Sequence, residues 1–202
     1  MKALYLALAA IVAASPVAAQ SAGEWTVGLG IANVAPVNNP GTLDGGLKTR
    51  IDNNARPTLT FEYFIKDNLG IEVLAASPFK HDVKIDGLGK VGSVKHLPPV
   101  ISLQAHFDTN TPFKPFVGVG VNWTNFFSEK TSGALEGSKL DVKHSFGVAL
   151  HLGTDYWINE KSALRADIRW IDINSDVYLN GKKIGKLDVD PVVVGASYVM
   201  KF

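Results

Sequence analysis

The chain of 202 residues contains no cysteine, so disulfides and thiolate metal ligands play no part in its fold. Its formal net charge is only +1 and no basic run interrupts it, which argues against a nucleic-acid partner. The five histidines are dispersed, and no HExxH motif or nucleophile elbow is present. We therefore expect no metal, no cofactor and no enzymatic activity. His81, His96 and His144 fall in polar segments, where we expect them to be solvated.

Long apolar runs are also missing. The longest, Leu4–Ala14, is shorter than the ~20 residues that a transmembrane helix needs. An early Lys2 and small residues up to Ala19 make residues 1–19 typical of a secretory signal peptide, cleaved after Ala19. No linker or repeat divides residues 20–202, which we interpret as one domain. Any membrane integration must then come from strands.

What the chain does have is alternation of apolar with small or polar residues, the period of a strand with two different faces. Each alternating segment is close to the 9–11 residues that a tilted strand needs to cross a bilayer. The segments are Trp25–Ala35, Thr58–Ile65, Leu69–Phe79, Val100–Phe107, Pro115–Phe127, Ser145–Tyr156, Ala163–Ile173 and Pro191–Phe202.

The connections alternate as well. Short polar turns (66–68, 108–112 and 159–161) take turns with long polar loops (36–56, 80–97, 128–143 and 174–190). Aromatic residues gather at both ends of the apolar face, as at the two interfaces of a membrane. These aromatics are Trp25, Tyr63, Phe107, Tyr156 and Phe202 near the short turns, and Phe79, Trp123, Phe127, Phe146 and Trp170 near the long loops. The pattern predicts an all-β, eight-stranded antiparallel up-and-down barrel in the bacterial outer membrane, surrounded by lipid and with its long loops outside.

The opposite face of the strands should fill the lumen, which in a barrel of eight strands is narrow. Near the short turns it is charged, and buried charges must pair with one another. We expect a structural ionic plug there, the alternative being a proton or ion relay. The plug residues are Glu62, Glu72, Asp155, Arg165, Asp167 and Lys201, with Gln104 and His106 close by.

Toward the long loops the same face turns small and apolar. It predicts a shallow greasy pocket that opens outward above the charged floor, unless the long loops fold in and fill it. The pocket would be lined by Leu74, Ala76, Asn122, Arg169 and Ile171. Pro78 and the Pro98-Pro99 pair either open a lateral gap in the wall or simply end their strands.

Several runs resemble the OmpW family of outer-membrane proteins. They are KDNLGIEVLAASPFKHDV (66–83), HLPP (96–99), FKPFVGVGVNWTNFF (113–127), 146–159 and 187–202. The resemblance implies an eight-stranded barrel that acts as a small channel or receptor for hydrophobic molecules. Leu74 matches a leucine of the family's apolar constriction. Arg169 departs from the pattern, because an inward aromatic is expected near it, and a guanidinium there makes the mid-lumen more polar.

The sequence therefore predicts that small hydrophobic molecules enter from the extracellular side and leave sideways into the bilayer. The alternative is a structural or adhesive barrel with a closed lumen. The alternating strand up to Phe202, with Tyr198 on the same apolar face, is typical of the signal by which the barrel-assembly machinery recognises its substrates.

Overall fold

The computed structural model describes residues 20–36, 41–44 and 46–202. Within these residues, fifteen strands form one continuous sheet, and one turn of 3-10 helix lies at Gly133–Leu135. In this part of the chain no helix is both long and apolar enough to cross a membrane. The predicted signal peptide, residues 1–19, lies outside the described residues.

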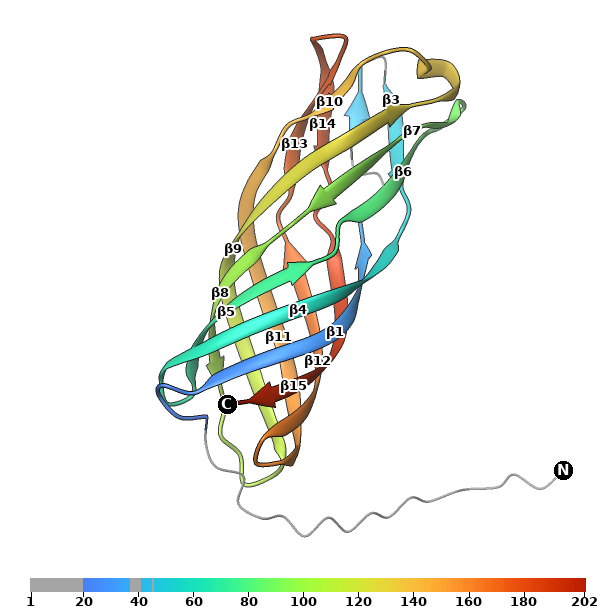
Figure 1. Cartoon of the computed structure of the whole chain (residues 1–202). Coiled ribbons are helices and arrows are strands. Elements are labelled where there is room, and N and C mark those ends of the chain that lie inside the picture. The colour runs from blue at the N-terminus through green and yellow to red at the C-terminus, as the bar shows by residue number, and fades with distance from the viewer. Residues whose placement is uncertain (1–19, 37–40, 45) are drawn as a thin grey trace, which may run out of the picture.

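Eight of the strands close into a barrel (Figure 1). Each is antiparallel to its neighbours in chain order, and the last pairs with the first from Thr26↔Lys201 to Ala35↔Val192. This arrangement confirms the predicted fold class. The eight are β1 (Trp25–Ala35), β4 (Asn54–Lys66), β5 (Leu69–Ala76), β8 (Val100–His106), β9 (Phe113–Thr131), β11 (Ser145–Asn159), β12 (Ser162–Ile171) and β15 (Val192–Lys201).

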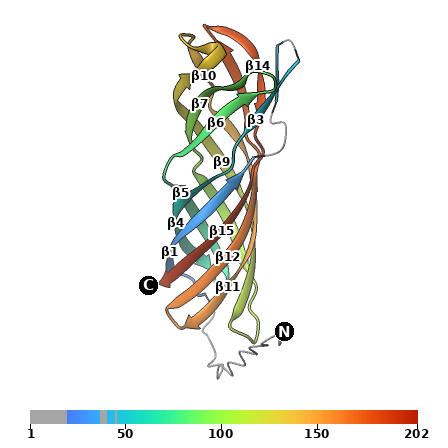
Figure 2. The same cartoon turned by 90° about the vertical axis from the view of Figure 1, so that its right-hand side faces the viewer.

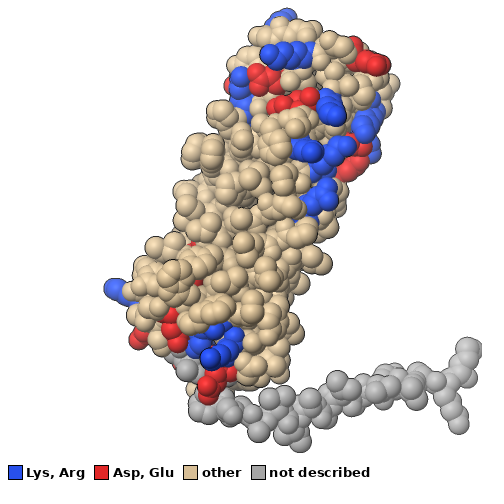
Figure 3. Space-filling view, in the orientation of Figure 1, with Lys and Arg blue, Asp and Glu red and all other residues tan. Residues whose placement is uncertain are grey.

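Alternation decides which side chains face out of this barrel. On β9, for example, Val117, Val119 and Val121 are about half exposed, whereas Asn122, the next residue, points to the other face and is fully buried. On the face seen in Figure 3 the outward side chains form an uncharged belt, with charged residues gathered above and below it. Such a belt is what a lipid-facing barrel needs.

The long segments between barrel strands are not loops, and in this respect the sequence-based prediction is wrong. They carry the other seven strands, which extend the wall beyond the barrel (Figures 1 and 2). Lysine, aspartate and glycine between the apolar positions hid their alternation. These strands are β2 (Thr42–Leu43), β3 (Leu47–Ile51), β6 (Phe79–Ile85), β7 (Gly89–Leu97), β10 (Leu140–Val142), β13 (Asn174–Leu179) and β14 (Lys182–Asp188).

The prolines mark the junction between barrel and extension. The third predicted strand was expected to run to Phe79, but β5 ends at Ala76, before Ser77 and Pro78. Beyond the junction β6 pairs with β3 and β7 instead of β4 and β8. Phe79 therefore opens β6 with its side chain 2% exposed, and its predicted place among the outward aromatics is wrong. Pro98 and Pro99 likewise lie between β7 and β8.

Candidate functional site in the barrel interior

The lower interior is closed by an ionic network centred on Arg165 of β12. Its guanidinium donates two hydrogen bonds to Asp155, at 2.7 and 2.9 Å, and one to Glu72 at 2.8 Å. A longer contact of 3.4 Å joins it to Glu62. The Phe116 ring lies against the same guanidinium, 4.4 Å from ring centroid to Cζ. All of these side chains are buried, so the paired charges form a floor across the lumen.

Two histidines extend this network. His106 Nε2 hydrogen-bonds Glu62 at 2.8 Å. His151 Nε2 lies 3.1 Å from Asp167, which is how Asp167 joins the cluster. The amide of Gln104 contacts the other nitrogen of His151 at 2.9 Å. Among the predicted plug residues, five are thus brought together.

Lys201 does not join them. It lies 3.2 Å from Glu24 at the end of the barrel where the short turns are, close to the Trp157 ring. Its position at the end of β15 places it beyond Arg165, so its expected membership of the plug is wrong. A second lysine at this rim, Lys114, pairs with Asp108 and donates to the Thr109 carbonyl.

Arg169 belongs to the floor, although it was expected among the pocket residues. Its Nη2 is 2.7 Å from Glu72, which therefore binds both arginines. A 3.5 Å contact links Nη1 to the Ser102 hydroxyl. The polarity that Arg169 brings to the mid-lumen is thus compensated by a carboxylate from the opposite wall.

Small residues near the floor make room for these side chains. A methyl group on Gly70 would collide with the carboxylate of Glu62, and one on Gly195 would lie 2.7 Å from Asp167. A cavity with about 350 Å³ of free space remains above Arg165. Its lining is mixed, with Thr58 and Thr60 beside Leu74 and Arg169.

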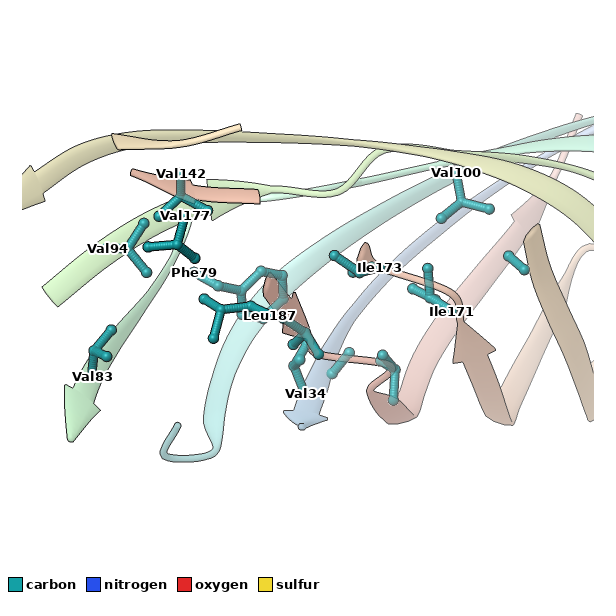
Figure 4. Close-up of a cluster of buried hydrophobic side chains, with 14 of the residues drawn as sticks. Val34, Phe79, Val83, Val94, Val100, Val142, Ile171, Ile173, Val177 and Leu187 are labelled. Carbon is teal, nitrogen blue, oxygen red and sulfur yellow. The ribbon is translucent and has the colours of Figure 1, made fainter. Parts of the chain in front are cut away.

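An apolar layer covers the floor and continues into the extension (Figure 4). Ile171, one of the predicted pocket residues, is 2% exposed in this layer, and Leu74 and Ala76 pack against it. Asn122, also predicted for the pocket, is fully buried and donates to the Pro99 carbonyl at 3.1 Å. These residues fill the neck between barrel and extension.

A second cavity lies above the neck, inside the extension. It is lined almost wholly by aliphatic side chains, and Thr49 is the one polar residue among the described residues that line it. None of the five predicted pocket residues lines it. The lining residues are Leu43, Thr49, Val83, Ile85, Val91, Val94, Leu135, Leu140, Val142, Val177, Ile184 and Leu187.

Two histidines lie between the neck and this cavity. His81 and His96 are each 3% exposed, and their rings stack with centroids 5.0 Å apart. Phe79 and Phe126 stack on His96 at 5.5 and 5.6 Å. The expectation that these histidines are solvated is wrong, because the segments that carry them fold into inward-facing strands. Burial lowers the pKa of His81, and burial together with the neighbouring His81 lowers that of His96 to about 3.

The arrangement of floor, neck and apolar extension can be compared with known proteins. The sequence model of the OmpW family matches residues 21–202. This chain belongs to the OmpW family. Outer membrane protein W of Vibrio cholerae is 35% identical over 198 residues, 92% of this chain and 90% of that protein. The chain is therefore an outer-membrane β-barrel.

Two further proteins are similar to this chain over most of its length. The crystal structure of the outer membrane protein OprG from Pseudomonas aeruginosa is 34% identical and superposes with a TM-score of 0.81, over 90% of this chain and 97% of that one. The dibenzothiophene metabolism operon protein PahQ of Pseudomonas aeruginosa is 27% identical over 203 residues, 94% of this chain and 93% of that protein.

The two residues expected to signal assembly lie on the outer surface of this OmpW family member. Tyr198 is 42% exposed, and its hydroxyl bonds the Ser162 hydroxyl at 2.8 Å. Phe202 is 74% exposed, and its backbone N–H donates to the Trp25 carbonyl at 2.9 Å. Neither side chain contributes to the interior.

Some interior residues escaped the sequence-based reasoning. His151 lies on the inward positions of β11, so the alternation that placed Asp155 in the lumen could also have placed His151 there. The cavity in the extension had a fainter signal. On β6 the buried positions Phe79, His81, Val83 and Ile85 alternate with Lys80, Asp82 and Lys84, a pattern hidden by its charges.

Proposed function

We propose that this outer-membrane barrel is a small channel or receptor for hydrophobic molecules, which enter the extension from outside the cell and leave sideways into the bilayer. The observation that carries the proposal is the apolar cavity of the extension, placed above a floor of paired charges. An aliphatic lining with few polar groups is the usual chemistry of a site for apolar ligands.

The route sideways follows from the floor. An apolar solute moving down the lumen would have to separate Arg165 and Arg169 from buried carboxylates, which is costly. The wall is weaker at the junction, where Ser77 and Pro78 separate β5 from β6 and β6 does not pair with β4. A single backbone bond, from Ser77 N–H to the Pro57 carbonyl at 3.2 Å, continues the β4–β5 ladder there. We infer that the exit lies beside this bond.

A relative supports the ligand class. The name of the PahQ protein connects it with dibenzothiophene metabolism, and dibenzothiophene is a flat, apolar aromatic molecule. The rival function is that of a structural or adhesive barrel with no ligand. The closed floor is compatible with this rival function as well. The rival function differs because it predicts no specific uptake of apolar molecules by the extension.

Substituting one lining residue separates the two functions. Val94→Arg introduces a long cation at a position that is 3% exposed and lines the cavity, so we expect binding of an apolar fluorophore to fall by about tenfold or more, since the buried charge has no partner. Leu88→Arg, in the exposed turn between β6 and β7, is the matched control and should bind normally. Fluorescence titration of both folded variants in lipid nanodiscs measures the difference. Equal binding by Val94→Arg and the original chain would support the structural barrel.

A further inference from the structure

Within the part of the chain that the structure describes, four buried polar atoms without a hydrogen-bond partner lie where the neck meets the apolar cavity. They are Asn54 Oδ1, Arg56 Nε, His81 Nε2 and His96 Nδ1. The residues come from three strands, β4, β6 and β7, that lie side by side or in contact at the junction. Buried polar groups are normally paired, so four open ones at one level indicate a place for a polar group from outside the protein.

Neighbouring contacts hold these side chains in place. The Asn54 amide donates to the Lys80 carbonyl at 3.0 Å, which leaves its Oδ1 free. His81 Nδ1 donates to the Asp52 carbonyl at 2.6 Å, so in the neutral ring Nε2 carries a free lone pair. His96 is fixed by its ring stacking on His81.

The cluster lies next to residues that line the apolar cavity. His81 is the cross-strand partner of Val94, which lines that cavity. Val83, two residues further along the inward face of β6, lines it as well. A molecule with its apolar part in the cavity would thus present its other end to the two histidines.

The charge of this cluster is positive and uncompensated. Arg56 lies near enough to His81 to lower the pKa of that imidazole. The two acidic residues that also act on His81 are already engaged, Asp52 with Lys84 and Asp82 with Lys90, each at 2.7 Å. Burial keeps both imidazoles neutral at physiological pH, so the net charge of the cluster is that of Arg56. Arg56 Nε and, in its Nδ1–H tautomer, His96 are donors, and these two donors complement an anionic head group.

We propose that Arg56 and His96 bind the carboxylate of an amphipathic acid whose apolar tail occupies the cavity of the extension, while His81 holds the His96 ring in place by stacking on it. Arg56 donates to one carboxylate oxygen and the Nδ1–H tautomer of His96 donates to the other. This assignment rests on the proposed function, because it names the class of molecule that the same cavity takes.

A pair of probes with the same tail tests the head-group site. We expect the folded full-length chain in lipid nanodiscs to bind dodecanoate at pH 8 about tenfold more tightly than methyl dodecanoate, because only the acid offers a charge-assisted hydrogen bond. Arg56→Gln should remove this preference, weakening dodecanoate by about tenfold and leaving the ester unchanged. Lys95→Gln, next to His96 but exposed on the outer face, removes the same charge and should behave as the original chain.

A second variant keeps the test decisive if Arg56→Gln does not assemble. His96→Phe preserves the stacked rings but removes Nδ1, and it should weaken dodecanoate by several-fold without affecting the ester. Equal affinity for both probes in the original chain, unchanged by either variant, would overturn the head-group site and leave the proposed function standing. Failure of the original chain to bind either probe would overturn both.

Discussion

Arg165 illustrates what a single side chain does in this interior. It contacts three carboxylates that are almost wholly buried, and among the described residues no other cation contacts Asp155 at a comparable distance. Arg50, on the outer face of the extension, instead pairs with Asp86 while both remain well exposed. The two arginines therefore have the same chemistry in opposite surroundings.

This contrast gives a prediction of stability. Arg165→Ala leaves the buried carboxylates without their main partner and should lower the free energy of unfolding by about 3–5 kcal/mol. Arg50→Ala removes an exposed pair and should lower it by only about 0–1 kcal/mol. Urea titration of the refolded barrels, followed by tryptophan fluorescence, compares them. Equal midpoints for the two variants would show that the floor is not held together by Arg165.

At the scale of elements, the eight barrel strands were predictable because each carries one uniformly apolar face. Burial in lipid makes that alternation strict on β1, β9 and β11, where sequence and structure agree closely. The extension has water outside and an apolar interior, so its outward positions are charged and its strands resemble loops. The residues of the candidate site were predictable to the same extent. Those of the floor lie on barrel strands and were predicted from the sequence, whereas those that line the cavity lie in the extension and were missed.

Phe202 permits a prediction about assembly. Because its side chain is 74% exposed on the lipid-facing surface, Phe202→Ala should cost little stability in the finished barrel. If the strand carries the recognition signal, the variant should nevertheless reach the outer membrane in much lower yield and accumulate as protease-sensitive chain. Phe113→Ala, at another exposed aromatic of the same rim (52% exposed), is the control. Fractionation and immunoblotting measure both, and equal yields would refute the signal.

For the whole molecule, the structure combines an apolar cavity in the extension, a packed neck and a closed ionic floor. These three levels follow one another along the barrel axis, and the wall changes its pairing at the level of the neck. Passage through the floor would break ion pairs, whereas passage beside Pro57 and Ser77 would break one backbone hydrogen bond. We therefore propose that apolar molecules leave sideways, through the wall at the junction.

Locking the wall at the junction with a disulfide tests whether apolar molecules leave there. The chain has no cysteine of its own, so Pro57→Cys combined with Ser77→Cys introduces one pair of thiols across the junction. With the protein inserted in vesicles, we would measure transfer of pyrene from water into the bilayer with the pair reduced and oxidised. We predict that the reduced form accelerates pyrene transfer, that oxidation lowers the transfer rate to that of protein-free vesicles, and that reduction restores the faster rate. Transfer that is equally fast in the oxidised form would contradict lateral exit.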